Sequence, residues 1–327
     1  MAAASLKSHG HKLLLKAAKG LASDQRNGLT FYEYIAYQGV RDYQRGLSAV
    51  GIQNLLPSTA RKSNFQTGPR GRLGPHEAAR VIVFFHGGGY MSPILSAHIS
   101  MAFGFAKPSN QDVSVVVLQY SLACEDANRY PSQLQQAVSL LQHLLRVEKL
   151  SPSAITLMGD SAGGHLLLGL LLHLRHPNPL VSPLEIKDQL GGAIFISPWA
   201  SLKSSAESMQ ANQHRDILST AALDYWAQNF LGDSPSDAWN APLTASAEWW
   251  SDLLVHKILV VYGEDELLRD DISILCERIK THHAKTTVFI LPREIHVHMV
   301  MNRFLRINAP CQSEKTFVKW FNDNLGL

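Results

Sequence analysis

The chain has 327 residues, of which 46% are hydrophobic and 17% are charged, and this composition excludes a disordered, collagen-like or coiled-coil protein. Thirty Lys and Arg residues against 27 Asp and Glu residues give a formal charge of +3, which is too small to predict a nucleic-acid partner. Cys124, Cys276 and Cys311 are odd in number and widely spaced. They predict neither a disulfide framework nor a structural zinc site, and they favour a reducing, cytoplasmic location.

The first segment, residues 1–55, is helical in pattern and rich in aromatic residues. Leu13, Ala17 and Leu21 share one helical face, and lysines lie mostly on the other. This pattern favours a helix packed on its own protein, with a membrane-surface helix or a transit peptide as alternatives. The most apolar stretch, Leu166–Leu174, is far too short to span a bilayer, so we expect no stable membrane insertion.

From residue 81 onward, short apolar runs alternate with helical patterns. Near-continuous apolar runs are typical of strands buried on both faces, and the alternation predicts a parallel sheet covered by helices on both sides. The predicted strands are 81–85, 113–118, 154–158, 193–196, 258–262 and 287–291. The predicted helices are 132–147, 162–176, 270–283 and 313–324.

Residues 199–250 interrupt this alternation and are too many for a simple strand-to-helix connection. They contain one clear helical pattern, 219–231, which Ser219 and Thr220 can cap. We therefore predict that residues 1–327 form a single α/β domain with a helical cap. The cap is assigned to residues 1–55 and 199–250, and the body to residues 56–198 and 251–327.

The strongest local motif follows the predicted strand 154–158. Gly159-Asp160-Ser161-Ala162-Gly163 fits the pattern G-x-S-x-G between a strand and a helix, which is the setting of a nucleophilic serine on a strained turn. The N-terminus of the following helix favours negative charge near the hydroxyl. A plain structural turn is the alternative. We predict that Ser161 is a nucleophile.

Three consecutive glycines follow the predicted strand 81–85, in His86-Gly87-Gly88-Gly89-Tyr90. Backbone N–H groups of such a loop can face a ligand without obstruction by side chains, as the oxyanion of an acyl-transfer intermediate requires. A flexible glycine loop is the alternative for this motif alone. Together with the serine turn, it predicts an oxyanion hole made by the N–H groups of Gly88, Gly89 and Ala162.

These two motifs resemble those of the hormone-sensitive-lipase group of α/β-hydrolases. Between them, the segment from Gln119 to Pro131 is similar to the group's D-Y-R-L-A-P-E…F-P, with departures at Gln119, Ser121 and Cys124. The stretch from Leu47 to Thr59 is similar to a fungal branch whose members often tailor secondary metabolites. The resemblance covers residues 80–327 well and implies the α/β-hydrolase fold, a doubly wound, mostly parallel sheet with a helical cap.

A nucleophilic serine needs a base and an orienting acid, which follow it along the chain in this fold. The group's G-x-x-D-x-L-x-D pattern, counted from Gly263, places Glu266 at the acid position. Asp265 is the alternative acid if the alignment with this pattern is off by one residue. An acidic surface loop without a catalytic role is the other interpretation of the segment. The group's P-G-x-x-H-G-F pattern places His296 at the base position. The resemblance thus implies a Ser161–His296–Glu266 triad.

Substrate contacts are expected from the cap and from loops beside the serine. The tryptophans of the cap can line an apolar pocket, or they can simply hold the cap together. His298 lies in an H-x-H pattern that lacks the further ligands of a metal site, and no phosphate-binding or dinucleotide motif is present. We therefore predict no metal and no cofactor. The predicted substrate-binding residues are Tyr90, Asp160, Trp199, Trp226 and His298.

The motifs predict a serine hydrolase that cleaves small apolar carboxylic esters through an acyl-enzyme, without nucleic acid as a partner. A homodimer is compatible with the sequence. One alternative keeps the triad but transfers the acyl group elsewhere, in an acyltransferase, thioesterase-like or cyclase tailoring enzyme of secondary-metabolite biosynthesis. Another is a catalytically silent ligand-binding protein on the same fold, which the presence of His296 disfavours.

Overall fold

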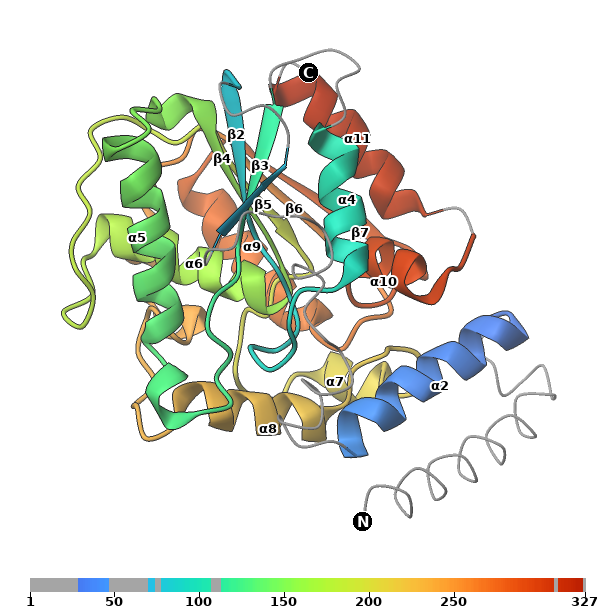
Figure 1. Cartoon of the computed structure of the whole chain (residues 1–327). Helices are drawn as coiled ribbons and strands as arrows, with labels where there is room; N and C mark the ends of the chain where they lie inside the picture. The colour runs from blue at the N-terminus through green and yellow to red at the C-terminus, as the bar shows by residue number, and fades with distance from the viewer. Residues whose placement is uncertain (1–28, 47–69, 74–77, 107–112, 309–310, 326–327) are drawn as a thin grey trace.

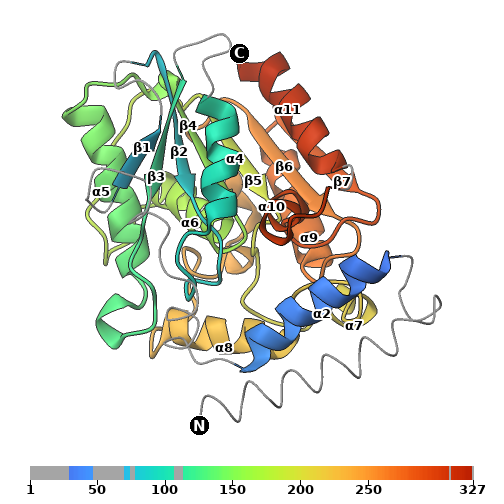
Figure 2. The ribbon, with the colours of Figure 1, turned by 45° about the vertical axis from the view of Figure 1, so that its right-hand side comes forward.

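A computed structural model describes residues 29–46, 70–73, 78–106, 113–308 and 311–325. Its centre is a seven-stranded sheet in the order β1-β3-β2-β4-β5-β6-β7 (Figures 1 and 2). The pair β1 and β3 is antiparallel, and every other neighbouring pair is parallel. The strands are β1 (Arg70–Leu73), β2 (Arg80–Phe85), β3 (Val113–Leu118), β4 (Ile155–Asp160), β5 (Gly192–Ile196), β6 (Ile258–Gly263) and β7 (Thr286–Leu291).

All six predicted strands are present, each within two residues of its expected bounds. The strand that was not predicted, β1, has only four residues and includes two arginines, so it carries no apolar run. Strands β2 to β6 form parallel pairs in the interior of the sheet, and their burial on both faces explains why they consist of near-continuous apolar residues.

Helices cover both faces of the sheet, as Figures 1 and 2 show. Helices α4, α10 and α11 lie on one face, and α5, α6 and α9 lie on the other. Of these, α4 and α10 were not predicted, because α4 is apolar on all sides and α10 is short. The bounds are α4 (Ser96–Ala106), α5 (Ser132–Arg146), α6 (Ala162–Arg175), α9 (Arg269–His282), α10 (His298–Leu305) and α11 (Gln312–Leu325).

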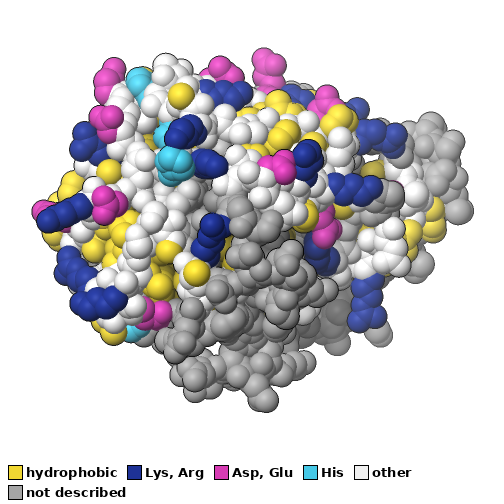
Figure 3. All heavy atoms as spheres, turned by 90° about the horizontal axis from the view of Figure 1, so that it is seen from above, with side chains coloured by type: hydrophobic (Ala, Val, Ile, Leu, Met, Phe, Trp, Pro, Cys, Tyr) yellow, Lys and Arg dark blue, Asp and Glu magenta, His cyan; other side chains and the backbone are white. Residues whose placement is uncertain are grey.

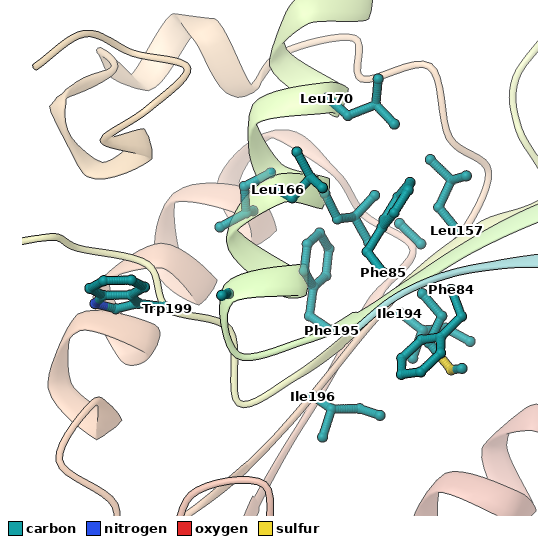
Figure 4. Close-up of a cluster of buried hydrophobic side chains, with 14 of the residues drawn as sticks. Phe84, Phe85, Leu157, Leu166, Leu170, Ile194, Phe195, Ile196 and Trp199 are labelled. Carbon is teal, nitrogen blue, oxygen red and sulfur yellow. The ribbon is translucent and has the colours of Figure 1, made fainter. Parts of the chain in front are cut away.

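The hydrophobic core lies on both faces of the sheet, and one part of it lies between α6 and the sheet. Along β5, alternate side chains point to opposite faces, so that Phe195 packs toward α6 while Ile194 and Ile196 point away from it (Figure 4). Phe85 and Leu170 extend the cluster on the α6 side. Every residue of α6 from Ala162 to Leu174 is buried, which fixes the start of this helix firmly against the sheet.

Three helices lie beyond the carboxyl ends of the strands, α2 (Phe31–Gly46), α7 (Glu207–Ala211) and α8 (Thr220–Leu231) (Figures 1 and 2). Helices α2 and α8 lie side by side, although more than 170 residues separate them in the sequence. The Ser219 hydroxyl accepts a hydrogen bond from the Ala222 N–H (3.3 Å) and caps α8 as predicted.

The remaining predictions for the N-terminal part, the helix through Leu13 and Leu21 and the segment from Leu47 to Thr59, lie outside the described residues. Within the described ranges, no helix combines the length and the apolar character that crossing a bilayer requires. On the face seen in Figure 3, Lys and Arg side chains are scattered with Asp and Glu side chains between them, in keeping with the small formal charge.

Candidate active site

Ser161 lies in the sharp turn between β4 and α6. Its backbone has φ 51 and ψ −118, a conformation that L-residues rarely adopt. The turn is possible because its neighbours lack side chains: a Cβ at Gly159 would overlap the Gly163 carbonyl, and one at Gly163 would overlap the carbonyl of Phe85. This turn thus places the Ser161 hydroxyl at the carboxyl edge of the sheet.

Ser161 and His296 meet at this edge, although 135 residues separate them. The Ser161 Oγ lies 2.8 Å from His296 Nε2, and His296 Nδ1 lies 3.0 Å from Glu266 Oε2. Because Nδ1 faces a carboxylate, it carries the ring proton of the neutral imidazole, and Nε2 is left to accept the hydroxyl proton of Ser161. The structure therefore brings the three predicted residues into one hydrogen-bonded chain.

Glu266 is held by two donors besides the imidazole. Its Oε1 accepts hydrogen bonds from the Ser197 hydroxyl (3.0 Å) and from the Gly263 N–H (2.5 Å), and its side chain is fully buried. Asp265, the alternative acid, turns away and pairs with Arg215 at 2.9 Å. The geometry therefore selects Glu266 as the partner of the imidazole.

Burial and charge act in opposite directions on this pair. Burial raises the pKa of Glu266, and its hydrogen bond and charge interaction with His296 oppose that rise. Burial alone would lower the pKa of His296, but the hydrogen bond and charge of Glu266, together with the charges of Asp216 and Asp160, raise it above its usual value. The site thus favours the imidazolium form that a general base reaches after taking a proton.

The loop after β2 brings free backbone donors to the serine. Gly88 and Gly89 have φ values of 115 and 61, and the Gly88 carbonyl accepts the N–H groups of Met91 and Ser92 at 3.0 and 2.9 Å. The N–H groups of Gly88, Gly89 and Ala162, the predicted oxyanion hole, are bonded to no acceptor in the part of the chain that the structure describes. They remain available for a ligand.

Asp160 connects this loop to the serine turn. Its Oδ1 accepts the Gly87 N–H at 2.8 Å, and its Oδ2 lies 3.2 Å from His98 Nε2. Because His98 Nδ1 accepts the Leu95 N–H (3.0 Å), the ring proton sits on Nε2 and is donated to Asp160. Asp160 is 1% exposed, so this bridge fixes the loop from inside the protein.

A cavity of about 390 Å³ opens at Ser161 and His296. Of the predicted substrate-binding residues, Asp160 and Trp226 line it. Helices α2 and α10 and the loop between β2 and α4 supply most of the remaining wall, and apart from the catalytic end its lining is predominantly apolar. Side chains that form this apolar wall include Val40, Leu218, Trp226, Val300, Met301 and Phe304.

Tyr90, Trp199 and His298, which were predicted to contact substrate, are not among the described residues that line this cavity. The left-handed backbone at Tyr90 (φ 61) turns its ring into the core, where it stacks on Phe230 and its hydroxyl lies 2.7 Å from His165 Nδ1. Trp199 packs beside His165 and is 2% exposed. His298 begins α10 and faces the backbone of the preceding loop.

Two buried polar residues at the site were missed by the sequence reasoning, His98 and Asp216. Neither belongs to a motif that pattern reading could single out, because their partners lie 62 and 80 residues away along the chain. In the described ranges, no group of three or more His, Cys, Asp or Glu side chains is arranged to hold a metal ion.

The sequence model of a family described as "Steryl acetyl hydrolase" matches residues 53–309. The chain belongs to this family. It is 27% identical over 245 residues to "Steryl acetyl hydrolase 1" of Saccharomyces cerevisiae, a match that covers 68% of this chain and 54% of the yeast protein. It therefore spans about half the length of that relative. It is also 31% identical over 223 residues to an "Acetyl-hydrolase" of Streptomyces hygroscopicus, covering 67% of this chain and 68% of that protein.

Solved structures confirm the predicted α/β-hydrolase fold of this steryl acetyl hydrolase family member. A "Hormone-Sensitive Lipase from a Metagenome Library" superposes with a TM-score of 0.70 at 23% identity, over 88% of this chain and 97% of that chain. An esterase of the bacterial hormone-sensitive lipase family superposes with a TM-score of 0.69 at 21% identity, over 91% and 100%. The predicted resemblance to the hormone-sensitive-lipase group is thereby confirmed.

Proposed function

We propose that the protein hydrolyses carboxylic esters that join a short acyl group, such as acetate, to a bulky apolar alcohol of the sterol class. One observation carries the proposal: the hydrogen-bonded chain Ser161–His296–Glu266 ends at the wall of an apolar cavity of about 390 Å³. A cavity of this size and lining suits one small apolar molecule. The family description and the name of the yeast relative support an acetylated sterol as the substrate.

In the first half of the reaction, His296 Nε2 takes the proton of the Ser161 hydroxyl as Oγ attacks the ester carbonyl carbon. The carbonyl oxygen gains negative charge and faces the free N–H groups of Gly88, Gly89 and Ala162. The imidazolium that forms is stabilised by Glu266 at 3.0 Å. When the tetrahedral intermediate collapses, His296 gives its proton to the departing alcohol and the acyl group remains on Ser161.

In the second half, a water molecule takes the place of the alcohol. His296 accepts a proton from that water as its oxygen attacks the acyl carbon, and the same three N–H groups face the oxyanion again. Collapse of the second intermediate returns the proton to Ser161 Oγ and releases the carboxylic acid. Each group ends in its starting protonation state, so the residues of this site suffice for the cycle.

The decisive experiment compares the wild-type protein with Ser161→Ala on p-nitrophenyl esters from acetate to decanoate and on a steryl acetate. We expect wild type to prefer the shortest acyl chains and to release free acetate from the steryl ester, while Ser161→Ala falls to the background rate. A fluorophosphonate probe should label the wild-type protein and leave Ser161→Ala unlabelled. Retained hydrolysis by Ser161→Ala would contradict the proposal.

Product analysis separates hydrolysis from the acyl-transfer alternative. With an added alcohol as acceptor, hydrolysis yields free acid in equal amount to the released alcohol, whereas a transferase yields a new ester at the expense of the acid. We expect the free acid to dominate. A new ester as the main product would instead support the tailoring-enzyme alternative.

A further inference from the structure

Asp216 is a fully buried carboxylate in the segment between α7 and α8. Its Oδ1 accepts the backbone N–H groups of His296 (3.0 Å) and Ile217 (2.7 Å). Its Oδ2 accepts the backbone N–H of Leu267 (2.7 Å). One carboxylate therefore bonds to the loop after β7, which bears the base, and to the loop after β6, which bears the acid.

The same cap segment contacts the acid loop a second time. The Asn212 side-chain amide donates to the carbonyl of Glu266 at 2.9 Å and to that of Glu264 at 3.1 Å. Asn212 thus binds the backbone carbonyl of Glu266, and Asp216 binds the backbone N–H of the next residue, Leu267. Both side chains come from the cap segment, so the cap fixes the backbone of two triad residues.

Helix α2 is connected to the same point. Arg41 is 3% exposed, and its Nε and Nη2 both donate to the backbone carbonyl of Asp216, the former at 2.9 Å. Other residues of α2, Ala36 and Val40 among them, form part of the cavity wall. The helix that contacts the substrate space is therefore bonded to the residue that holds both triad loops.

Charge adds to this arrangement. The groups that interact with Asp216 are Tyr37 from α2, Glu266 from the loop after β6 and His296 from the loop after β7, while Arg41 of α2 bonds to its backbone carbonyl. Burial raises the pKa of Asp216, while the His296 charge and three backbone N–H donors oppose that rise. In return, Asp216 is one of the charges that raise the pKa of His296, together with Glu266 and Asp160.

We propose that Asp216 is a positioning residue of the triad, whose carboxylate holds the backbone of His296 and of the Glu266 loop and, through Arg41, makes that geometry depend on the seating of α2. The inference rests on the proposed hydrolysis of esters by Ser161. An amide cannot replace a buried carboxylate that accepts three backbone N–H groups, because its NH₂ group would face one of these donors without forming a hydrogen bond.

The test compares Asp216→Asn with wild type on p-nitrophenyl acetate across the pH range. We expect kcat to fall about ten- to a hundredfold, because a loosened triad misplaces the reacting atoms. KM should change by less than about threefold, because Asp216 does not line the cavity. The pH midpoint of kcat/KM should move downward, because a negative charge beside His296 is lost.

Asp237→Asn is the matched control. Asp237 also accepts two backbone N–H groups in the cap, those of Trp239 (2.9 Å) and Asn240 (2.8 Å), and within the described residues it makes no hydrogen bond to the triad. We expect this variant to lose thermal stability while keeping the wild-type kcat and pH midpoint. If Asp237→Asn shifted the pH midpoint as much as Asp216→Asn does, the effect would be one of general cap stability and the proposal would be overturned.

Arg41→Gln tests the connection through α2 and does not depend on whether Asp216→Asn folds. We expect a lower kcat together with a higher KM, because α2 both lines the cavity and supports Asp216. Wild-type values of both constants in Arg41→Gln, or of kcat and pH midpoint in Asp216→Asn, would overturn the proposal. Failure of the underlying function looks different, since wild type itself would then neither hydrolyse the ester nor react with a fluorophosphonate.

Discussion

Replacing Glu266 by Gln removes a charge from the site while keeping the shape of the side chain. Because Oε1 accepts hydrogen bonds from Ser197 and Gly263, the amide oxygen of Gln will take that side, and the NH₂ group will face His296 Nδ1. A donor at that position stabilises the tautomer with the proton on Nε2, which cannot accept the proton of Ser161. The variant therefore holds the base in its inactive form.

The size of the effect follows from that tautomer. In a Ser-His-Asp triad the change of acid to amide costs about 10⁴ in kcat. For Glu266→Gln we expect kcat to fall by a factor of about 10³ to 10⁴, which corresponds to about 4 to 5.5 kcal/mol of activation free energy. Initial rates of p-nitrophenyl acetate hydrolysis measure it, with Ser161→Ala as the background and circular dichroism as the check that the variant is folded.

Asp265→Asn is the companion variant, since it alters the neighbouring acid without touching the imidazole. Its ion pair with Arg215 is partly exposed and worth about 0–1 kcal/mol, so we expect kcat to change by less than about threefold. The reasoning is refuted if Glu266→Gln stays within about tenfold of wild type. An equally damaging Asp265→Asn would refute the choice of acid.

Four further predictions follow from the same geometry. Since the pKa of His296 is raised above 6.5 and the base must be neutral, kcat/KM should fall as the pH drops, with its midpoint above pH 6.5; a lower midpoint would contradict the charge argument. In urea unfolding, the free energy of unfolding of Ser161→Gly should exceed that of Ser161→Ala by about 1 kcal/mol, because glycine adopts φ 51 without strain. Equal free energies would argue against strain at this turn. In Gly89→Ala the new Cβ would lie 2.5 Å from the Trp226 ring at φ 61, so both kcat and melting temperature should drop, and unchanged values would show that the loop can yield. Burial and the charge of Asp270 raise the pKa of Asp271 to about 6, so wild type should lose stability relative to Asp271→Asn as the pH rises from 4 through 6; parallel melting curves would disprove the shift.

The motifs that could be predicted from the sequence share one property: close contact with a backbone group determines which residue type can occupy the position. The serine turn has glycine at positions 159 and 163 because a side chain at either position would overlap a backbone carbonyl group. The group's pattern, counted from Gly263, gave Glu266, and in the structure the Gly263 N–H donates to that carboxylate, which faces His296. For Gly159 and Glu266 the contacting backbone groups belong to Gly163 and Gly263, which lie within four positions along the chain, so such patterns are visible in a single sequence.

The features that were missed depend on contacts between distant segments. Whether an aromatic ring near the site faces the substrate or the core depends on the local backbone, and Tyr90 and Trp199 turn inward. Asp216 resembles any other acidic residue in a polar stretch, and only the folded chain shows its carboxylate at the backbone of His296. Period and propensity contain no information about such pairs.

The three carboxylates whose charges act on His296, those of Glu266, Asp216 and Asp160, also bear on how the reaction ends. The ester that enters is neutral, whereas the acid that leaves carries a negative charge once it loses its proton. Like charges in a poorly solvated cavity repel over several ångströms, so departure of the carboxylate is favoured and its return is opposed. The same repulsion disfavours esters whose acyl group is itself anionic. Under the proposed hydrolysis of esters, we therefore expect the buried acids of this site to weaken the binding of anionic products and anionic esters, in addition to raising the pKa of His296.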